Sequence, residues 1–444
     1  MPMPAYPTII VPGITASYLL DDYPLTPETI WSVMSRNYER ASLHPDNPRF
    51  EAVEPARVYA GQVFEIAYQE LIEELRHNLR PKVDLPVPVF PFGYDWRQPL
   101  ADTAARLASF IDEVIERTKL MRHYAKEDYG AAPKVNLVGH SMGGLVITGY
   151  LARQGKNHRV HKVATLATPF QGSFEAVIKI TTGTADLGVD APSSREREAA
   201  RLTPALYSLL PSFTAGIEPA GTNLFQPDTW QTSILDTIEE YVRLHGVSPK
   251  DKKKQSSELF ASLLNGALSE RRLTDQLKLG DIGLTADDWL CVAGVDSKTR
   301  VALSVTQGRG GPSFNFRSAD RQNKWATGAT AAERRETGDG TVPFAGAIPK
   351  FLNEENIICV TPDDYGYWEV MDRTISATAG FHGILPNMDM LHRMLVSFLT
   401  SQPPKRDNVW GRPAPGIIQP AWPGALKNMR NKDVDRGSAP GKQN

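Results

Sequence analysis

Short apolar stretches alternate with longer amphipathic ones along the first part of the chain, and this alternation limits the possible folds more than any other feature. The apolar stretches predict buried strands at 8–11, 87–92, 134–138 and 160–167. Between them, apolar residues at helical spacing predict helices over 62–79, 107–115 and 143–153. Strands and helices in this order form a largely parallel sheet with helices on both faces. The sequence therefore predicts an α/β fold.

This pattern stops between about residues 173 and 285, where no strand of the sheet is evident and apolar residues recur at helical steps. We expect this segment to form a helical cap, or lid, over the upper edge of the sheet; an ordinary pair of core helices is the alternative. Strand patterns resume at 289–295 and 357–360, and a helix is predicted over 386–400.

The chain thus divides into four predicted parts. Residues 1–172 and 286–401 form the core, and residues 173–285 form the cap. The remaining residues, 402–444, hold seven prolines and eight basic against three acidic side chains. This composition predicts a loosely packed, basic C-terminal extension.

Charge and cysteine content exclude several classes of protein. The net charge is −2, which lacks the excess of positive charge typical of a nucleic-acid binder. The two cysteines, Cys291 and Cys359, form no C-x-x-C, so a disulfide framework and a thiolate zinc site are excluded. We expect buried free thiols, with a bond between the two cysteines as the alternative, and no metal or other cofactor.

Targeting signals are also missing from the sequence pattern. Residues 1–20 carry no charged side chain, but they lack a basic start and four prolines interrupt them. The low-charge run 135–152 contains polar residues and four glycines, which makes it a poor membrane span. These patterns predict a cytoplasmic protein without a signal peptide or a transmembrane segment.

One segment points to nucleophilic catalysis. Residues 139–143 read Gly-His-Ser-Met-Gly and lie between a predicted strand and a predicted helix. In that setting G-x-S-x-G is typical of a serine on a strained turn, where glycines leave room for the backbone. The helix N-terminus also favours developing negative charge. We therefore predict Ser141 as the nucleophile; a tight turn with an ordinary serine is the alternative.

A serine nucleophile needs a base, and in folds of this kind an acid and then a histidine follow it along the chain. Most of the nine histidines are excluded because they come too early along the chain or lie in a predicted helix or in the insertion. Two histidines near the end of the core remain. His392 lies within a predicted helix, whereas His382 lies in a glycine-flanked loop, so His382 is the predicted base. Asp339, in a tight Gly-Asp-Gly turn, is favoured as the acid over Asp363 and Asp364.

Several motifs taken together resemble the lecithin:cholesterol acyltransferase family. This family includes lysosomal-type phospholipases A and phospholipid:diacylglycerol acyltransferases. The most specific segments are Tyr-Asp-Trp-Arg and Gly-Asp-Gly-Thr-Val-Pro. In chain order the motifs are Val-Pro-Gly (11–13), Tyr-Asp-Trp-Arg (94–97), Gly-His-Ser-Met-Gly-Gly (139–144), Ala-Thr-Pro (167–169), Gly-Asp-Gly-Thr-Val-Pro (338–343) and His-Gly (382–383).

The resemblance implies an α/β-hydrolase fold with a cap and an oxyanion hole made by the backbone N–H groups of Ile14 and Met142. The order of the elements agrees, because a Pro-Gly turn ends the first strand and the residue after the serine opens a helix. The chain departs from the animal enzymes in having no cysteine before residue 291. This departure leaves peripheral contact with a membrane open.

The predicted function is therefore a serine hydrolase or O-acyltransferase that acts on lipid esters. The cap is expected to line a groove for the acyl chain, with Phe213, Phe260 and Leu264 as the predicted substrate-binding residues. Joining the cap to the core is their alternative role. Two other functions are weighed: an esterase for small soluble esters, and an inactive hydrolase fold that serves as an interaction module.

Overall fold

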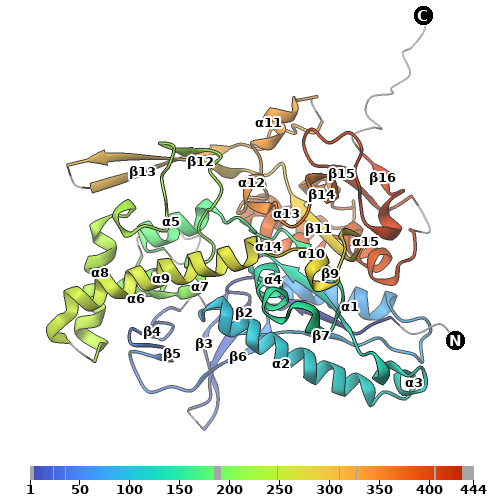
Figure 1. The fold of residues 1–444 in the computed structure, drawn as a ribbon, viewed down its shortest axis with the longest axis horizontal. Helices are drawn as coiled ribbons and strands as arrows, with labels where there is room; N and C mark the ends of the chain where they lie inside the picture. The colour runs from blue at the N-terminus through green and yellow to red at the C-terminus, as the bar shows by residue number, and fades with distance from the viewer. Residues whose placement is uncertain are drawn as a thin grey trace, which may run out of the picture.

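Eight strands form the central sheet of the computed structural model, which describes residues 5–23, 25–35, 37–184, 192–247, 249–309, 311–326, 328–404 and 407–432 (Figure 1). The strand order is β16-β15-β14-β11-β9-β8-β1-β7. Six strands run parallel: β1 (Thr8–Val11), β7 (Val89–Pro91), β8 (Val135–His140), β9 (Val160–Leu166), β11 (Trp289–Gly294) and β14 (Ile357–Val360). They are the six strands that the sequence predicts, so the α/β fold is confirmed.

Helices cover both faces of this sheet because neighbouring residues of a strand point to opposite faces. On β1, Ile9 belongs to one apolar cluster and Ile10 to the other. The first cluster includes residues of α2 (Leu100–Lys119) and α4 (Met142–Gln154). The second includes residues of α1 (Glu65–Asn78) and α15 (Asp389–Thr400). These four helices are the ones that the apolar spacing predicts in the core.

The predicted cap segment is mainly helical. Its helix α9 contacts α4 in the core as well as α7 and α8. The helices are α5 (Phe174–Thr182), α6 (Ser194–Leu202), α7 (Pro204–Tyr207), α8 (Thr232–His245), α9 (Lys252–Asp275) and α10 (Leu279–Ile282). Residues 185–191 and 248 of the segment lie outside the described residues.

A small second sheet joins this segment to the part of the chain that follows it. Strand β10 (Ile217–Glu218) pairs with β12 (Thr299–Gly308), which forms a hairpin with β13 (Gly311–Ala319). In Figure 1 the hairpin extends to the left of the central sheet, above α8 and α9. The predicted boundary near residue 285 therefore separates segments that share a sheet, and the division into core and cap stays a prediction.

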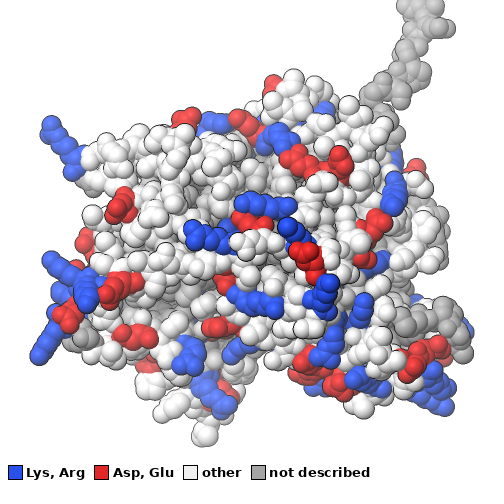
Figure 2. All heavy atoms as spheres, viewed as in Figure 1, with Lys and Arg blue, Asp and Glu red and all other residues white. Residues whose placement is uncertain are grey.

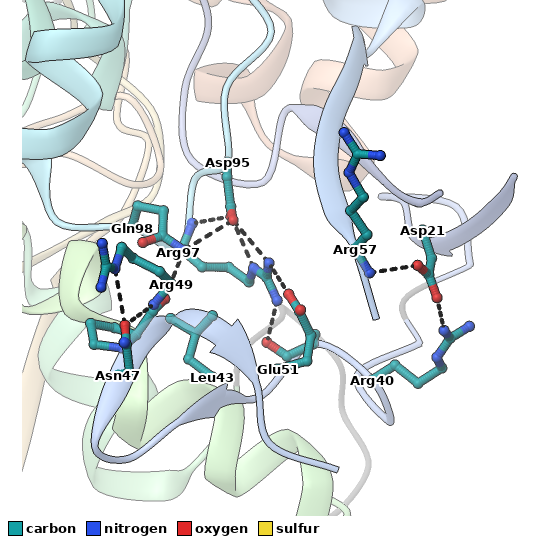
Figure 3. Close-up of polar contacts among 12 residues, drawn as sticks. Asp21, Arg40, Leu43, Asn47, Arg49, Glu51, Arg57, Asp95, Arg97 and Gln98 are labelled. Atoms are coloured by element: carbon teal, nitrogen blue, oxygen red, sulfur yellow. Dashed lines mark hydrogen bonds and ion pairs between the residues drawn. The ribbon is translucent and has the colours of Figure 1, made fainter. Parts of the chain in front are cut away.

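The segment 17–63 forms strands that the sequence pattern did not reveal. Strands β2 (Ser17–Asp21), β3 (Glu28–Trp31) and β6 (Val58–Val63) form an antiparallel sheet, and β4 (Leu43–His44) and β5 (Asn47–Glu51) form a short hairpin. Asp21 on β2 accepts hydrogen bonds from the backbone N–H of Arg57 at 2.8 Å and from the side chain of Arg40 (Figure 3). These contacts tie the loops around the small sheet to its first strand.

The C-terminal segment is packed rather than loose over its described part, so that expectation was wrong. Strand β15 (Trp410–Pro413) pairs antiparallel with β14, and β16 (Arg430–Asn431) pairs with β15. Trp422 is buried. The basic side chains Arg412 and Lys432 both pair with the buried Asp364. The predicted basic character of the segment thus supplies specific ion pairs, while residues 405–406 and 433–444 lie outside the described residues.

The surface carries charged side chains of both signs. Basic and acidic side chains are intermixed over the face drawn in Figure 2.

Cys291 and Cys359 are buried on the neighbouring strands β11 and β14 and form no disulfide. Within the described ranges, no helix is both long enough and apolar enough to cross a bilayer.

Candidate active site

Ser141 lies on the turn between β8 and α4, in the strained conformation that the motif predicts. Its φ of 53° and ψ of −129° are rare for a residue with a side chain. The glycines around it leave the room that the turn needs. A Cβ on Gly143 would come within 2.1 Å of the carbonyl oxygen of Val11, and one on Gly139 within 2.8 Å of the amide nitrogen of Gly144.

The structure brings the three predicted catalytic residues into one hydrogen-bonded series. The Nε2 atom of His382 lies 2.8 Å from the Oγ atom of Ser141, and its Nδ1 atom lies 2.7 Å from Oδ2 of Asp339. Ser141 and Asp339 are buried, and the histidine side chain is 12% exposed. This arrangement allows the imidazole to take a proton from the serine while the carboxylate holds the ring in the required tautomer.

The backbone around Asp339 fixes that carboxylate. Its Oδ1 atom accepts hydrogen bonds from the N–H groups of Thr341 at 2.9 Å and Val342 at 2.7 Å, which leaves Oδ2 for His382. Asp339 lies beside the end of β11, because a Cβ on Gly294 would come within 2.6 Å of the Asp339 Cβ. Asp339 therefore reaches the carboxyl edge of the sheet through a tight turn.

The other carboxylates considered from the sequence lie elsewhere. Asp364 accepts from Lys432 at 2.6 Å, from the Trp410 indole at 2.8 Å and from Arg412. Burial alone would raise the pKa of Asp364, but the nearby positive charges and their hydrogen bonds lower it below its ordinary value. Asp363 pairs with Arg321. Neither is arranged to orient His382.

The predicted oxyanion donors lie on the two segments that meet at Ser141. A Cβ on Gly13 would come within 3.0 Å of the Ser141 Cβ and 3.4 Å of its Oγ, so the turn that leads to Ile14 lies against the nucleophile. Met142 is the first residue of α4, where a backbone N–H has no partner within the helix. The oxyanion role of these two N–H groups stays a prediction.

The three predicted substrate-binding residues lie in two different environments. Phe213 is half-buried, and its ring lies 5.4 Å from the ring of Phe174. Phe260 and Leu264 are buried in the apolar core, and Phe260 contacts Tyr207 and Trp230. Phe260 and Leu264 therefore pack inside the cap segment, whereas Phe213 is partly exposed. A substrate contact stays a prediction for all three residues.

The Tyr-Asp-Trp-Arg segment holds the surroundings of the Gly13 turn together. The Tyr94 hydroxyl donates to the carbonyl of Pro12 at 2.9 Å, and the rings of Trp96 and Trp31 lie 4.8 Å apart. The other two residues of the segment, Asp95 and Arg97, attach the β4–β5 hairpin to this part of the core.

Arg97 makes that attachment through a buried cluster (Figure 3). Its guanidinium donates to both carboxylate oxygens of Asp95, to the carbonyl of Ala41 at 3.1 Å and to Glu51 at 2.8 Å. Burial alone would raise the pKa of Asp95, but the charge and hydrogen bonds of Arg97 lower it. No sequence pattern indicates that Glu51 completes this cluster, because 46 positions separate it from Arg97.

The model of a family described as lecithin:cholesterol acyltransferase matches residues 68–244. The resemblance to this family is confirmed. The match includes Ser141 and the Tyr-Asp-Trp-Arg segment, but Asp339 and His382 lie beyond it. No curated protein sequence matches the chain.

One solved structure supports the fold of this chain. A chain in the crystal structure of the Tle4-Tli4 complex covers 77% of this chain and is itself covered to 88%, with a TM-score of 0.51 and 14% identity. At that identity the likeness shows the fold alone. The Bacillus licheniformis lipase BlEst2 in its mature form matches 47% of this chain and 56% of its own, at 17% identity; its TM-score of 0.26 carries no argument.

Proposed function

We propose that the protein is a serine hydrolase or O-acyltransferase that acts on lipid esters, of the phospholipase or lipid acyltransferase type. The observation that carries this proposal is the hydrogen-bonded series from Ser141 through His382 to Asp339. A serine hydroxyl becomes an effective nucleophile only with such a base beside it. The family match supports an ester as the substrate.

In the proposed reaction, Ser141 Oγ attacks the carbonyl carbon of the ester while His382 Nε2 takes the serine proton. The N–H groups of Ile14 and Met142 stabilise the negative charge on the carbonyl oxygen. The intermediate then releases the alcohol, which takes the proton from His382, and leaves an acyl ester on Ser141. Water or a second alcohol attacks this ester and gives its proton to His382. The bond between the acyl group and Ser141 Oγ then breaks, His382 returns the proton to that oxygen, and the fatty acid or the new ester leaves.

The cap segment adjoins this site, which favours a bulky acyl chain over a small ester. Ser173, at the start of α5, donates to the carbonyl of Thr341 at 2.5 Å and accepts from the N–H of Glu175. Thr341 in turn donates its N–H to Asp339. The half-buried Phe213 lies against Phe174 in the same segment, so an acyl chain that leaves Ser141 on this side would meet apolar rings.

The surface near the site also supports contact with a lipid surface. Tyr367, Trp368, Val370 and Met371 are 76%, 88%, 62% and 72% exposed. They follow β14, and parallel strands place their carboxyl ends, including the end of β8 at Ser141, on one edge of the sheet. Exposed Trp and Tyr side chains are typical of the boundary between lipid and water.

Labelled phospholipid, offered with and without an alcohol acceptor, tests the proposed function. We expect fatty acid, or an acylated alcohol, to form with wild-type protein and with Ser257→Ala, whose exposed serine is the matched control. Ser141→Ala should form neither product and should lose labelling by a fluorophosphonate. Turnover of short soluble esters without any turnover of phospholipid would favour the small-ester esterase. Absence of both activities, without labelling of Ser141, would favour the inactive interaction module.

A further inference from the structure

Two buried side chains outside the catalytic series connect the three segments that form the site. The backbone N–H of Gly13 donates to the hydroxyl oxygen of Tyr68 at 2.9 Å. That hydroxyl lies 2.7 Å from Nδ1 of His140, and Nε2 of His140 lies 2.9 Å from the carbonyl oxygen of His382. Tyr68 is 1% exposed and His140 is 4% exposed.

The end groups, with a neutral imidazole between them, set the direction of every hydrogen bond in this series. The carbonyl of His382 can only accept, so Nε2 of His140 carries a hydrogen and donates it. In a neutral imidazole Nδ1 is then an acceptor, and the hydroxyl of Tyr68 donates to it. The oxygen of Tyr68 in turn accepts from the N–H of Gly13, which can only donate. Burial and the neighbouring His382 lower the pKa of His140 well below its ordinary value, in agreement with a neutral ring.

The two ends of this series belong to the parts of the site that must move least during the proposed reaction. Gly13 lies against Ser141 and is followed by the predicted oxyanion donor Ile14. The other end holds the backbone of the predicted base, His382, and His140 itself directly precedes the nucleophile. A shift at either end would change a reacting distance, and rates of positioned reactions fall steeply with such shifts.

We propose that Tyr68 and His140 are positioning residues for acyl transfer, an inference that rests on the proposed function. Together they set the distance between the Gly13 turn and the backbone of His382, with Ser141 between them. The rate of acylation of Ser141 should depend on them, while binding of the substrate should not. Tyr68 lies on α1, more than 50 positions from Gly13 and from His140. Its role therefore links the first turn of the chain to His382, which lies on the short helix α14 (Phe381–Ile384) and not in the loop that the sequence predicted.

The first test compares Tyr68→Phe with Tyr124→Phe, a matched control. Tyr124 is also buried, and its hydroxyl donates to the carbonyl of Ala5, which precedes β1 at the end opposite Gly13. Both substitutions remove one buried hydroxyl and keep the ring. For Tyr68→Phe we expect kcat on a p-nitrophenyl acyl ester, and the rate of fluorophosphonate labelling, to fall about 10- to 100-fold with KM nearly unchanged. Tyr124→Phe should keep the wild-type kcat.

The second test distinguishes the two hydrogen bonds of the His140 side chain, one with Tyr68 and one with the carbonyl of His382. In His140→Gln an amide N–H can still reach the carbonyl of His382, whereas in His140→Asn the shorter side chain can reach only Tyr68. We expect His140→Gln to label at least about tenfold faster than His140→Asn, since the bond that holds His382 is retained. Thermal unfolding of each variant checks that it is folded.

Two results would overturn the inference. One is a labelling rate of Tyr68→Phe equal to that of Tyr124→Phe, and the other is equal rates for the two His140 variants. A wild-type protein that does not react at Ser141 is a different result, because it would overturn the proposed function itself.

Discussion

Replacing Asp339 by asparagine tests the proposed base more directly than removing the carboxyl group. In the wild type, Oδ1 accepts two backbone N–H groups, from Thr341 and Val342, and Oδ2 accepts from His382. An asparagine oxygen can keep the two backbone bonds, which turns its NH2 group toward His382. The Nδ1 atom of the imidazole must then accept, so Nε2 carries the hydrogen and can no longer take the proton of Ser141.

The expected loss in kcat is about 10⁴-fold, as for a serine triad with the wrong histidine tautomer. This corresponds to about 5 kcal/mol of transition-state stabilisation. The free energy of unfolding should change by about 1 kcal/mol or less, because the buried oxygen keeps both backbone donors. Pre-steady-state hydrolysis of a p-nitrophenyl ester measures the first quantity, and urea denaturation measures the second.

Asp364→Asn is the matched control, because it alters a buried aspartate that pairs with Arg412 and Lys432 instead of with a histidine. Breaking a buried ion pair costs about 3–5 kcal/mol of stability, and this variant should keep kcat within about tenfold of wild type in conditions where it is folded. Asp339→Asn should thus lower kcat with little change in stability, and Asp364→Asn should lower stability with little change in kcat. The assignment of Asp339 would be refuted if Asp339→Asn kept more than about a tenth of kcat.

Three further predictions concern the acid range, the surface and the cap. The stability advantage of wild type over Asp364→Asn should be complete above the ordinary aspartate pKa of 3.8 and should shrink as the pH falls through the lowered folded-state pKa, which urea denaturation down to about pH 3 can follow. Trp368→Ser should weaken flotation with phosphatidylcholine vesicles severalfold, whereas Leu120→Ser, 86% exposed on a different segment, should leave it unchanged. Phe213→Ala should alter the preferred acyl chain length in an assay with esters of increasing length. Phe260→Ala should instead cost about 3–5 kcal/mol in urea denaturation and leave that preference unchanged.

Periodicity predicted the core of the fold because most of its parallel strands are continuous buried runs and helices such as α1 and α2 have one apolar face. The antiparallel strands near the N-terminus escaped prediction because they carry no such pattern. In β5, for example, a proline and two charged side chains occupy three of the five positions. Strand β15 escaped for a different reason: its Trp-Gly-Arg-Pro sequence has no strand pattern, and it lies beside β14 with Trp410 and Arg412 donating to the distant Asp364.

Local sequence predicted the nucleophile better than its partners. The turn at Ser141 has its own signature, because glycines are required where a Cβ would collide with the neighbouring strand. The positions of Tyr68 and His140 have no comparable signature. Apolar spacing places Tyr68 on the inner face of α1, but it cannot say that the hydroxyl meets residues 55 and 72 positions away.

The three aspartates near the end of the core show what the structure adds to such motifs. Asp339, Asp363 and Asp364 all follow turns, and order along the chain alone does not separate them. What separates them is which lone pairs remain: backbone N–H groups occupy one oxygen of Asp339 and leave the other for His382, whereas cations and an indole N–H occupy those of Asp364. A carboxylate can orient an imidazole only if one oxygen is held and the other is open to it. Asp364 fails this criterion, and Asp363 is an exposed carboxylate paired with Arg321, so Asp339 is the one of the three that contacts His382.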